Sequence, residues 1–288
     1  MRPFTIYQQI CNLYPTQQEK LIELILSVTK PDRIFLLGAS LYRRRSESVF
    51  CTCAPSSRQV SDYFLLVLIS KNIENNISEI QDKIEQRCNT FLPSTILALQ
   101  TERFSVWLKT SHRFARTVHN TSVLLFDKGD IIFPEPGDLN PENENKTNEK
   151  CLAQVQSNIR EFLVGVDLFR VRAQNRMASF MLHQAIEQGL HAILKIGTGY
   201  HCCTHNIDRL LRYGSLVSYG LPDIFPRKTD KDRHLFSLLQ KAYINTRYKE
   251  DYFIDNDDLT ILIGKAMAIQ GLLEEVGKEH IKINPDNK

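Results

Sequence analysis

The first residues that could do chemistry are a glycine, a serine and an aspartate beside two apolar runs. Gly38 and Ser40 follow the run at residues 33–37, and Ser61 and Asp62 precede a second run. Small residues after a strand let backbone N–H groups approach a triphosphate, and an aspartate at the next strand can bind the divalent cation that bridges its phosphates. This order predicts a phosphate site, with Asp62 as a candidate Mg²⁺ ligand. A simple turn that leads into a strand is the competing interpretation.

A second polar set lies in the C-terminal half. Gln184 and Glu187 stand three residues apart in a helical pattern, so they share one helix face. Such groups can bind a polar ligand, or they can hydrogen-bond buried partners across a bundle. We expect His183, beside them, to be a packed or surface histidine rather than a catalyst.

Composition narrows the class of protein. The chain has 288 residues, 42% hydrophobic and 24% charged, with a formal net charge of +3. These values are typical of a folded protein of about two domains, and the charge does not by itself indicate a nucleic-acid binder. The apolar run at residues 64–69 is far shorter than the roughly 18 residues of a membrane span. An odd number of cysteines and an N-terminus without a secretory pattern lead us to expect a cytoplasmic protein with reduced thiols and no membrane contact.

A polar segment divides the chain into two parts. Residues 134–150 hold three prolines, four asparagines and almost no apolar side chain, so they cannot order themselves by burial. We therefore expect one domain at residues 1–133, a linker at 134–150 and a second domain at 151–288.

Strands alternate with helices in the first domain. We expect strands at residues 33–37, 63–69, 95–99, 104–108 and 123–126, and helices at 16–28, 76–88 and 112–119. This alternation predicts an α/β domain with a covered, mixed sheet.

The second domain shows only helical spacing of apolar residues. We expect an all-α bundle of about five helices, centred on residues 159–169, 177–194, 207–211, 235–243 and 262–273. Asp255, Asp257 and Asp258 stand where the N-cap of the last helix should be.

The first domain resembles the minimal nucleotidyltransferase family over about residues 15–133. The resemblance is carried by Phe35-Leu-Leu-Gly38-Ala-Ser40, by Ser61-Asp62-Tyr-Phe64-Leu-Leu-Val67 and by Val123-Leu-Leu-Phe-Asp127. Members of that family carry Gly-Ser and then Ser-Asp-x-Asp-Leu.

The departures from this pattern predict an inactive domain. Phe64 stands where the family has a second metal-binding aspartate, and the strand at 94–99 offers no third carboxylate, since Glu102 lies just past its end. One aspartate cannot hold two divalent ions. We therefore expect Gly38, Ser40 and Asp62 to be vestigial.

The second domain resembles the HEPN family (higher eukaryotes and prokaryotes nucleotide-binding) over about residues 152–278. Three segments carry the resemblance: Ser179-Phe-Met-Leu-His183-Gln184-Ala185-Ile-Glu187, then Tyr200 with Thr204-His205-Asn206-Ile-Asp-Arg-Leu, then Tyr243 with Thr246-Arg247-Tyr248 and Asp251-Tyr252.

The resemblance implies a shared groove, a homodimer and a ligand. The groove would bring together the nucleotide-binding residues Gln184, Glu187, His205, Asn206, Arg247 and Tyr248, with Arg247 as a forked phosphate donor. Ribonucleases of the family carry an Arg followed four to six residues later by a His. Arg247 has no such His, and Arg176 with His183 lies in the second helix, where the family does not place the pair. Without a base near the phosphate, RNA cleavage is disfavoured.

Two further sets of residues have side chains that can bind a metal ion or a phosphate. His201-Cys202-Cys203-Thr-His205 and Cys51-x-Cys53 contain metal-binding side chains, but adjacent ligands cannot easily surround a tetrahedral zinc ion. We expect packed thiols. Arg43-Arg44-Arg45 forms either a solvated surface run or a contact to phosphate.

The sequence thus predicts a degenerate nucleotidyltransferase-like α/β domain followed by an all-α HEPN bundle. We expect it to bind a nucleotide (ATP or GTP) or RNA without efficient catalysis, and Mg²⁺ could accompany the nucleotide. Because the two family modules often occur as adjacent toxin and antitoxin chains, the resemblance also implies a relation to toxin–antitoxin systems. The alternatives are an active nucleotidyltransferase or HEPN ribonuclease, and a non-catalytic interaction scaffold.

Overall fold

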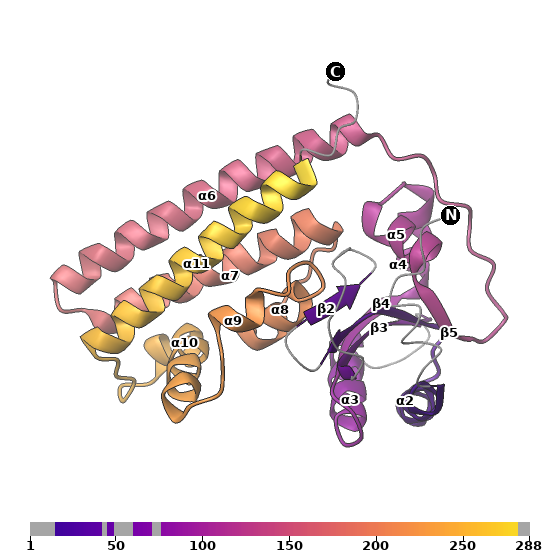
Figure 1. Cartoon of the computed structure of the whole chain (residues 1–288), viewed down its shortest axis with the longest axis horizontal. Coiled ribbons are helices and arrows are strands. Elements are labelled where there is room, and N and C mark those ends of the chain that lie inside the picture. Colours follow the sequence, from indigo (N-terminus) through magenta and orange to yellow (C-terminus); the bar gives the residue numbers. More distant parts are fainter. Residues whose placement is uncertain (1–14, 42–44, 49–59, 71–75, 282–288) are drawn as a thin grey trace. The chain divides into compact units, whose positions relative to one another are not determined.

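The computed structural model describes residues 15–41, 45–48, 60–70 and 76–281, and these form two compact units divided between Leu139 and Asn140 (Figure 1). The candidate residues Arg43, Arg44, Cys51 and Cys53 lie outside the described ranges. Within those ranges, no helix has both the length and the apolar character needed to cross a membrane.

The N-terminal unit is built on one mixed sheet. Its strand order is β2-β1-β3-β4, and β5 also pairs with β1; β3 and β4 run parallel, whereas the pairs that include β1 are antiparallel. The strands are β1 (Arg33–Leu41), β2 (Arg45–Ser48), β3 (Val60–Ile69), β4 (Ser94–Gln100) and β5 (Val123–Asp127). The predicted mixed sheet is therefore present, and β2, which includes Arg45, is an element that the sequence pattern missed.

Helices cover both faces of this sheet (Figure 1). They are α2 (Pro15–Val28), α3 (Ile77–Cys88), α4 (Thr101–Lys109) and α5 (Arg113–Thr121). On one face, helices α2 and α3 contribute Leu21, Ile25, Ile80 and Ile84 to a core. On the other face, the ring centre of Phe104 in α4 lies 6.0 Å from that of Phe35 in β1. The free edge of β4 is covered by α3, because the side chains of Gln81 and Glu85 accept hydrogen bonds from backbone N–H groups of that strand.

The predicted strand at residues 104–108 is wrong, because these residues belong to helix α4. Phe104 and Leu108 are both fully buried and lie four residues apart, which places them on one face of a helix. The spacing of apolar residues in this short run fits either a helix or a strand, and packing against the sheet favours the helix.

The C-terminal unit is helical throughout its regular structure. Its elements are α6 (Pro141–Val171), α7 (Asn175–Thr198), α8 (Ile207–Gly214), the single turn α9 (Leu221–Ile224), α10 (Asp230–Tyr248) and α11 (Asn256–Ile281). Helix α7 is the central helix, buried over much of its length and packed against α6, α8, α10 and α11. The five longer helices match the predicted bundle, and Asp255 caps the last one by accepting from the N–H of Asp258.

Helix α6 begins inside the segment expected to be a linker. The Asn140 side chain accepts from the N–H groups of Glu142 and Asn143, and Pro141 occupies the first turn. These are strong N-terminal signals of a helix, and acidic residues in the first turn complement its dipole. Residues 141–150 are therefore ordered by capping and by extension of a longer helix rather than by an apolar face of their own.

Candidate functional site

A buried carboxylate on α7 is the centre of the candidate site. The Glu187 side chain is only 9% exposed, and its Oε1 atom lies 2.8 Å from Nδ1 of His205. Its Oε2 atom lies 3.4 Å from Nδ1 of His183 and 3.4 Å from Nε2 of Gln184. His191, one further turn along α7, places Nε2 at 4.0 Å from Oε1. One acceptor group thus faces three imidazoles and an amide.

His183 is a neutral component of this cluster. It is fully buried, and burial lowers its pKa to about 4, with further lowering from the nearby His205 and Arg247. Its ring stacks 5.4 Å from the ring of Tyr243. The expectation of a packed histidine is confirmed, and its contact with Glu187 makes it part of the wall of the site.

His191 is a second neutral histidine beside Glu187. Burial lowers its pKa, and its Nε2 atom lies 3.0 Å from the carbonyl oxygen of Thr204, so Nε2 carries the proton. The Sγ atom of Cys202 lies 3.7 Å from Nδ1, and burial raises the pKa of that thiol to about 11. Cys202 is therefore a protonated, packed thiol, as the sequence predicted, whereas Cys203 beside it is exposed and that part of the prediction is wrong.

His205 differs from the other two histidines because its side chain is 59% exposed. A carboxylate can only accept hydrogen bonds, so Nδ1 carries the proton and donates it to Glu187. The other ring nitrogen, Nε2, is then the acceptor of the neutral tautomer. The ring stacks on Tyr243 at 5.0 Å with an interplanar angle of 11°, which fixes its orientation.

The arginine of the site lies beside the same tyrosine. Arg247 is exposed, its Nε atom donates to the carbonyl oxygen of Tyr243, and its guanidinium carbon lies 4.3 Å from the centre of that ring. Tyr248 and Phe180 contribute further rings at 5.3 and 5.9 Å. This arrangement holds the stem of Arg247 and leaves its terminal nitrogens available to an anion.

The structure brings together most of the predicted set. Gln184, Glu187 and His205 are in contact, and Arg247 joins them through Tyr243. Tyr248 is 74% exposed, and its ring lies near the guanidinium group of Arg247.

Asn206 has a structural role instead. Its side-chain oxygen caps α8 by accepting from the N–H of Arg209 and also accepts from Gln240 of α10. Asn206 therefore holds the loop in front of α8 and ties it to α10.

Sequence reasoning missed the role of Tyr243 and His191. Tyr243 precedes Arg247 by four residues, and His183, Glu187 and His191 repeat every fourth residue, so helical spacing was the available signal. The expectation that no base lies near Arg247 also needs correction. His205 comes from the loop before α8 and stacks on the same tyrosine.

The residues that the sequence led us to expect as vestigial, Gly38, Ser40 and Asp62, lie on neighbouring strands. Ser40 pairs with Asp62 and Gly38 pairs with Phe64 across β1 and β3, while Thr95 of β4 lies beside Phe64 and donates to Asp62 at 3.1 Å. Phe64 is 1% exposed and belongs to the core. Asp62 is thus paired with Ser40 and accepts from Thr95, and Phe64 stands two residues further along β3.

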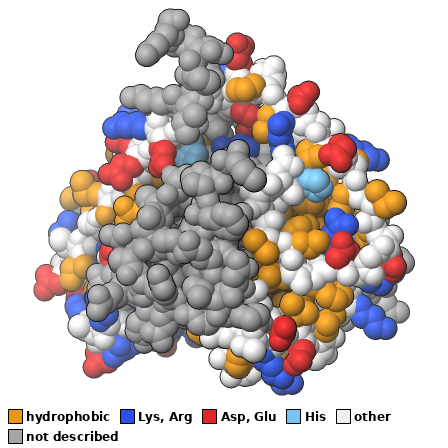
Figure 2. Space-filling view, turned by 45° about the vertical axis from the view of Figure 1, so that its right-hand side comes forward, with side chains coloured by type: hydrophobic (Ala, Val, Ile, Leu, Met, Phe, Trp, Pro, Cys, Tyr) orange, Lys and Arg blue, Asp and Glu red, His pale blue; other side chains and the backbone are white. Residues whose placement is uncertain are grey.

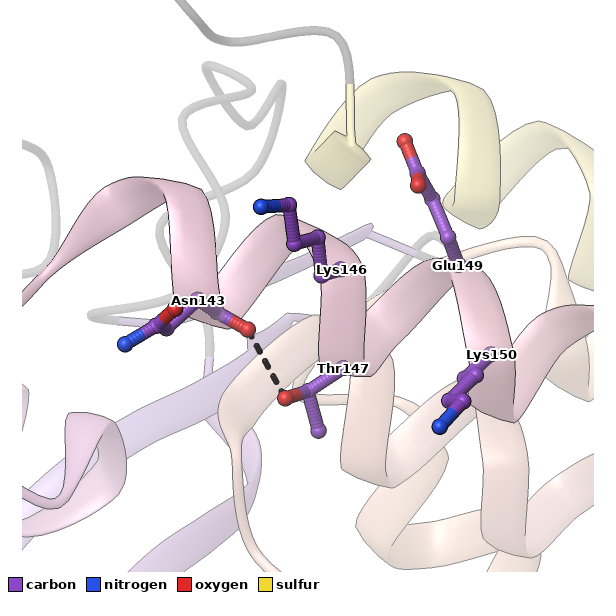
Figure 3. Close-up of a pocket in the computed structure, with 5 residues that line it drawn as sticks. All are labelled: Asn143, Lys146, Thr147, Glu149 and Lys150. Atoms are coloured by element: carbon purple, nitrogen blue, oxygen red, sulfur yellow. Dashed lines mark hydrogen bonds between the residues drawn. The ribbon is translucent and has the colours of Figure 1, made fainter.

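A metal-binding group and a surface hollow were the other candidates for a site. Within the described ranges, no three His, Cys, Asp or Glu side chains are arranged to hold a metal ion. A shallow hollow of about 660 Å³ lies along the first turns of α6 (Figure 3), lined by Asn143, Lys146, Thr147, Glu149 and Lys150. Neither Glu187 nor any of the three histidines around it lines this hollow. On the face drawn in Figure 2, basic and acidic side chains are interspersed outside the grey atoms.

Comparison with known proteins identifies the helical unit in part. The model of the HEPN domain family matches residues 167–276, which run from the end of α6 through most of α11. No curated protein matches the chain.

Proposed function

We propose that the HEPN domain at residues 167–276 binds the phosphate of a nucleotide such as ATP or GTP, or of RNA, beside Glu187, His205 and Arg247. The observation that carries the proposal is the shared contact of His205 and Arg247 with Tyr243. It places an exposed guanidinium and an exposed imidazole at one point of the surface. Both can donate to phosphate oxygens, the imidazole when Nε2 is protonated.

Arg247 is the expected phosphate anchor. Only its Nε atom is hydrogen-bonded to a described protein group, so the fork of terminal nitrogens can engage two oxygens at once. The exposed ring of Tyr248 beside it could stack on a base. The competing interpretation, an internal polar network, accounts for Gln184 and Glu187 but leaves the exposed arginine without a role.

The test is isothermal titration of ATP, GTP and a short single-stranded RNA, with and without Mg²⁺. Loss of a charge-assisted contact in Arg247→Ala should cost about 1.5–3 kcal/mol, or roughly 10- to 100-fold in affinity. Arg172→Ala, at an exposed arginine after α6, is the matched control and should bind as the wild type does. If Arg247→Ala melts normally and binds within about twofold of wild type, the site lies elsewhere. If it fails to fold, the internal-network interpretation is favoured.

We also propose that the N-terminal unit is a degenerate nucleotidyltransferase-like domain. The buried Phe64, two residues after Asp62 on β3, supports this proposal, because a carboxylate there would have to hold the second ion of a two-metal centre.

Two parts of the proposal rest on the family alone. HEPN domains often dimerise, so we expect a homodimer, and light scattering that gives one chain mass at tens of micromolar would contradict it. The relation to toxin–antitoxin systems is likewise proposed from the family of the helical unit.

A further inference from the structure

We propose that His205 is a covalent phosphoryl acceptor, so that the site takes a phosphoryl group from a phosphoanhydride onto Nε2 of this histidine. The inference rests on the proposed function, because Arg247 would hold the oxygens of the incoming phosphate. It adds a chemical step to that binding site. The structural basis is the contact of Nδ1 with Glu187 together with the exposure of the ring.

His205 differs from the neighbouring nucleophiles His183, His191, Cys202 and Ser179 because its side chain is exposed and its Nδ1 contact with Glu187 leaves Nε2 as the second ring nitrogen. His183 is fully buried, and both ring nitrogens of His191 are engaged, Nε2 by Thr204 and Nδ1 by Cys202. Cys202 is itself buried and stays protonated at neutral pH. The Ser179 hydroxyl donates to a backbone carbonyl of its own helix.

The lone pair of His205 is held in one direction by three elements. Glu187 of α7 accepts from Nδ1, so a neutral ring carries its lone pair on Nε2. Tyr243 of α10 packs against the ring. The neighbouring residues are tied as well, because the Thr204 carbonyl accepts from His191 and the Asn206 side chain caps α8. A nucleophile fixed in this way does not lose rotational freedom when it reacts.

The charges at the site suit an in-line transfer. Nε2 attacks the terminal phosphorus, the N–P bond forms as the P–O bond to the leaving group breaks, and the leaving phosphate keeps the electron pair. The phosphorylated ring becomes an imidazolium whose Nδ1 proton remains on the hydrogen bond to Glu187, which stabilises the positive charge. Arg247 faces the negative charge of the transferred group. Attack of water on the phosphorus then releases inorganic phosphate and restores the neutral ring.

The test uses the full chain with MgATP and, separately, with phosphoramidate, a small donor that needs no nucleotide site. We expect intact-mass spectrometry to show one added phosphoryl group, labile in acid and stable in alkali, and peptide mapping to place it on His205. His205→Asn should abolish the adduct. His201→Asn is the matched control, since His201 is an exposed histidine of the same loop, and it should keep the adduct.

Glu187 acts as a positioning residue, and its contribution has its own measurement. Glu187→Gln can donate as well as accept, so Nδ1 is no longer forced to carry the proton, and phosphorylation should slow by about 100-fold. The pH profile of the adduct rate should also shift, which loss of packing alone would not cause.

Three outcomes would overturn the assignment. They are no adduct with either donor in a protein that binds nucleotide through Arg247, an adduct that persists in His205→Asn, and RNA cleavage that needs His205 but forms no adduct. The last would show that His205 acts as a base. If nucleotide binding itself fails, the phosphoramidate arm still decides whether His205 accepts a phosphoryl group.

Discussion

Nδ1 of His205 lies 2.8 Å from Oε1 of Glu187, and this contact joins the loop before α8 to the central helix α7. The carboxylate is buried, whereas the histidine is more than half exposed. The hydrogen bond therefore connects a buried carboxylate of the bundle to a side chain that solvent and ligands can reach.

Removal of the Glu187 carboxylate should destabilise the helical unit. In Glu187→Ala, His183 and Gln184 lose a buried acceptor and His205 loses its anchor, so we expect about 1–3 kcal/mol less free energy of unfolding in urea. Glu161→Ala, at an exposed acid of α6, should leave the unfolding free energy unchanged. Equal stability of the two variants would mean that the cluster contributes nothing to folding.

Acid should weaken the fold through His183. Burial lowers the pKa of this histidine from 6.5 to about 4, so the unfolded chain binds the proton more readily. The stability gained from keeping the ring neutral is complete above pH 6.5 and is lost as the pH falls toward 4. Between pH 7 and pH 5 this group should remove about 2 kcal/mol.

The measurement is urea unfolding of wild type and His183→Gln at both pH values. The variant should show a smaller loss on acidification by about that amount, because it lacks the titrating ring. Parallel pH dependence in the two proteins would count against a neutral buried His183.

Replacing a glycine by alanine should change the stability in opposite directions at two positions on different helices. A Cβ at Gly189 of α7 would lie 2.6 Å from Cγ2 of Ile269, whereas a Cβ at Gly271 of α11 would meet nothing within 4 Å. Gly189→Ala should therefore cost about 1–3 kcal/mol through overpacking. Gly271→Ala should stabilise the helix by up to about 1 kcal/mol. Thermal unfolding of both variants checks the pair, and a neutral Gly189→Ala would show that α11 shifts freely against α7.

The N-terminal unit should transfer no nucleotide. Incubation with labelled ATP or GTP and Mg²⁺ should leave both the protein and added RNA without label, because in the proposed degenerate domain the buried Phe64 would stand at a metal-ligand position. Labelling that requires Mg²⁺ and disappears in Asp62→Ala would show that the domain is active.

Much of the fold could be predicted from local patterns. The strands at 63–69 and 95–99 and the helices around 177–194 and 262–273 follow from apolar spacing, because each presents a face to a core. The errors fall where one signal fits two structures. Residues 104–108 suited a strand or a helix, and the polar residues 141–150 looked like a linker although Asn140 and Pro141 start a helix there.

For the candidate site, the sequence by itself determined the residue types and the helical register. The spacing of Gln184 and Glu187 put them on one face, and the HEPN-like segments supplied His205 and Arg247. Only the tertiary structure decided that the loop before α8 places His205 against Glu187, that Tyr243 links His205 with Arg247, and that Asn206 caps a helix. Contacts between residues far apart in the chain depend on how α7, α8 and α10 pack, and helix packing is set by the fit of whole surfaces rather than by any local spacing.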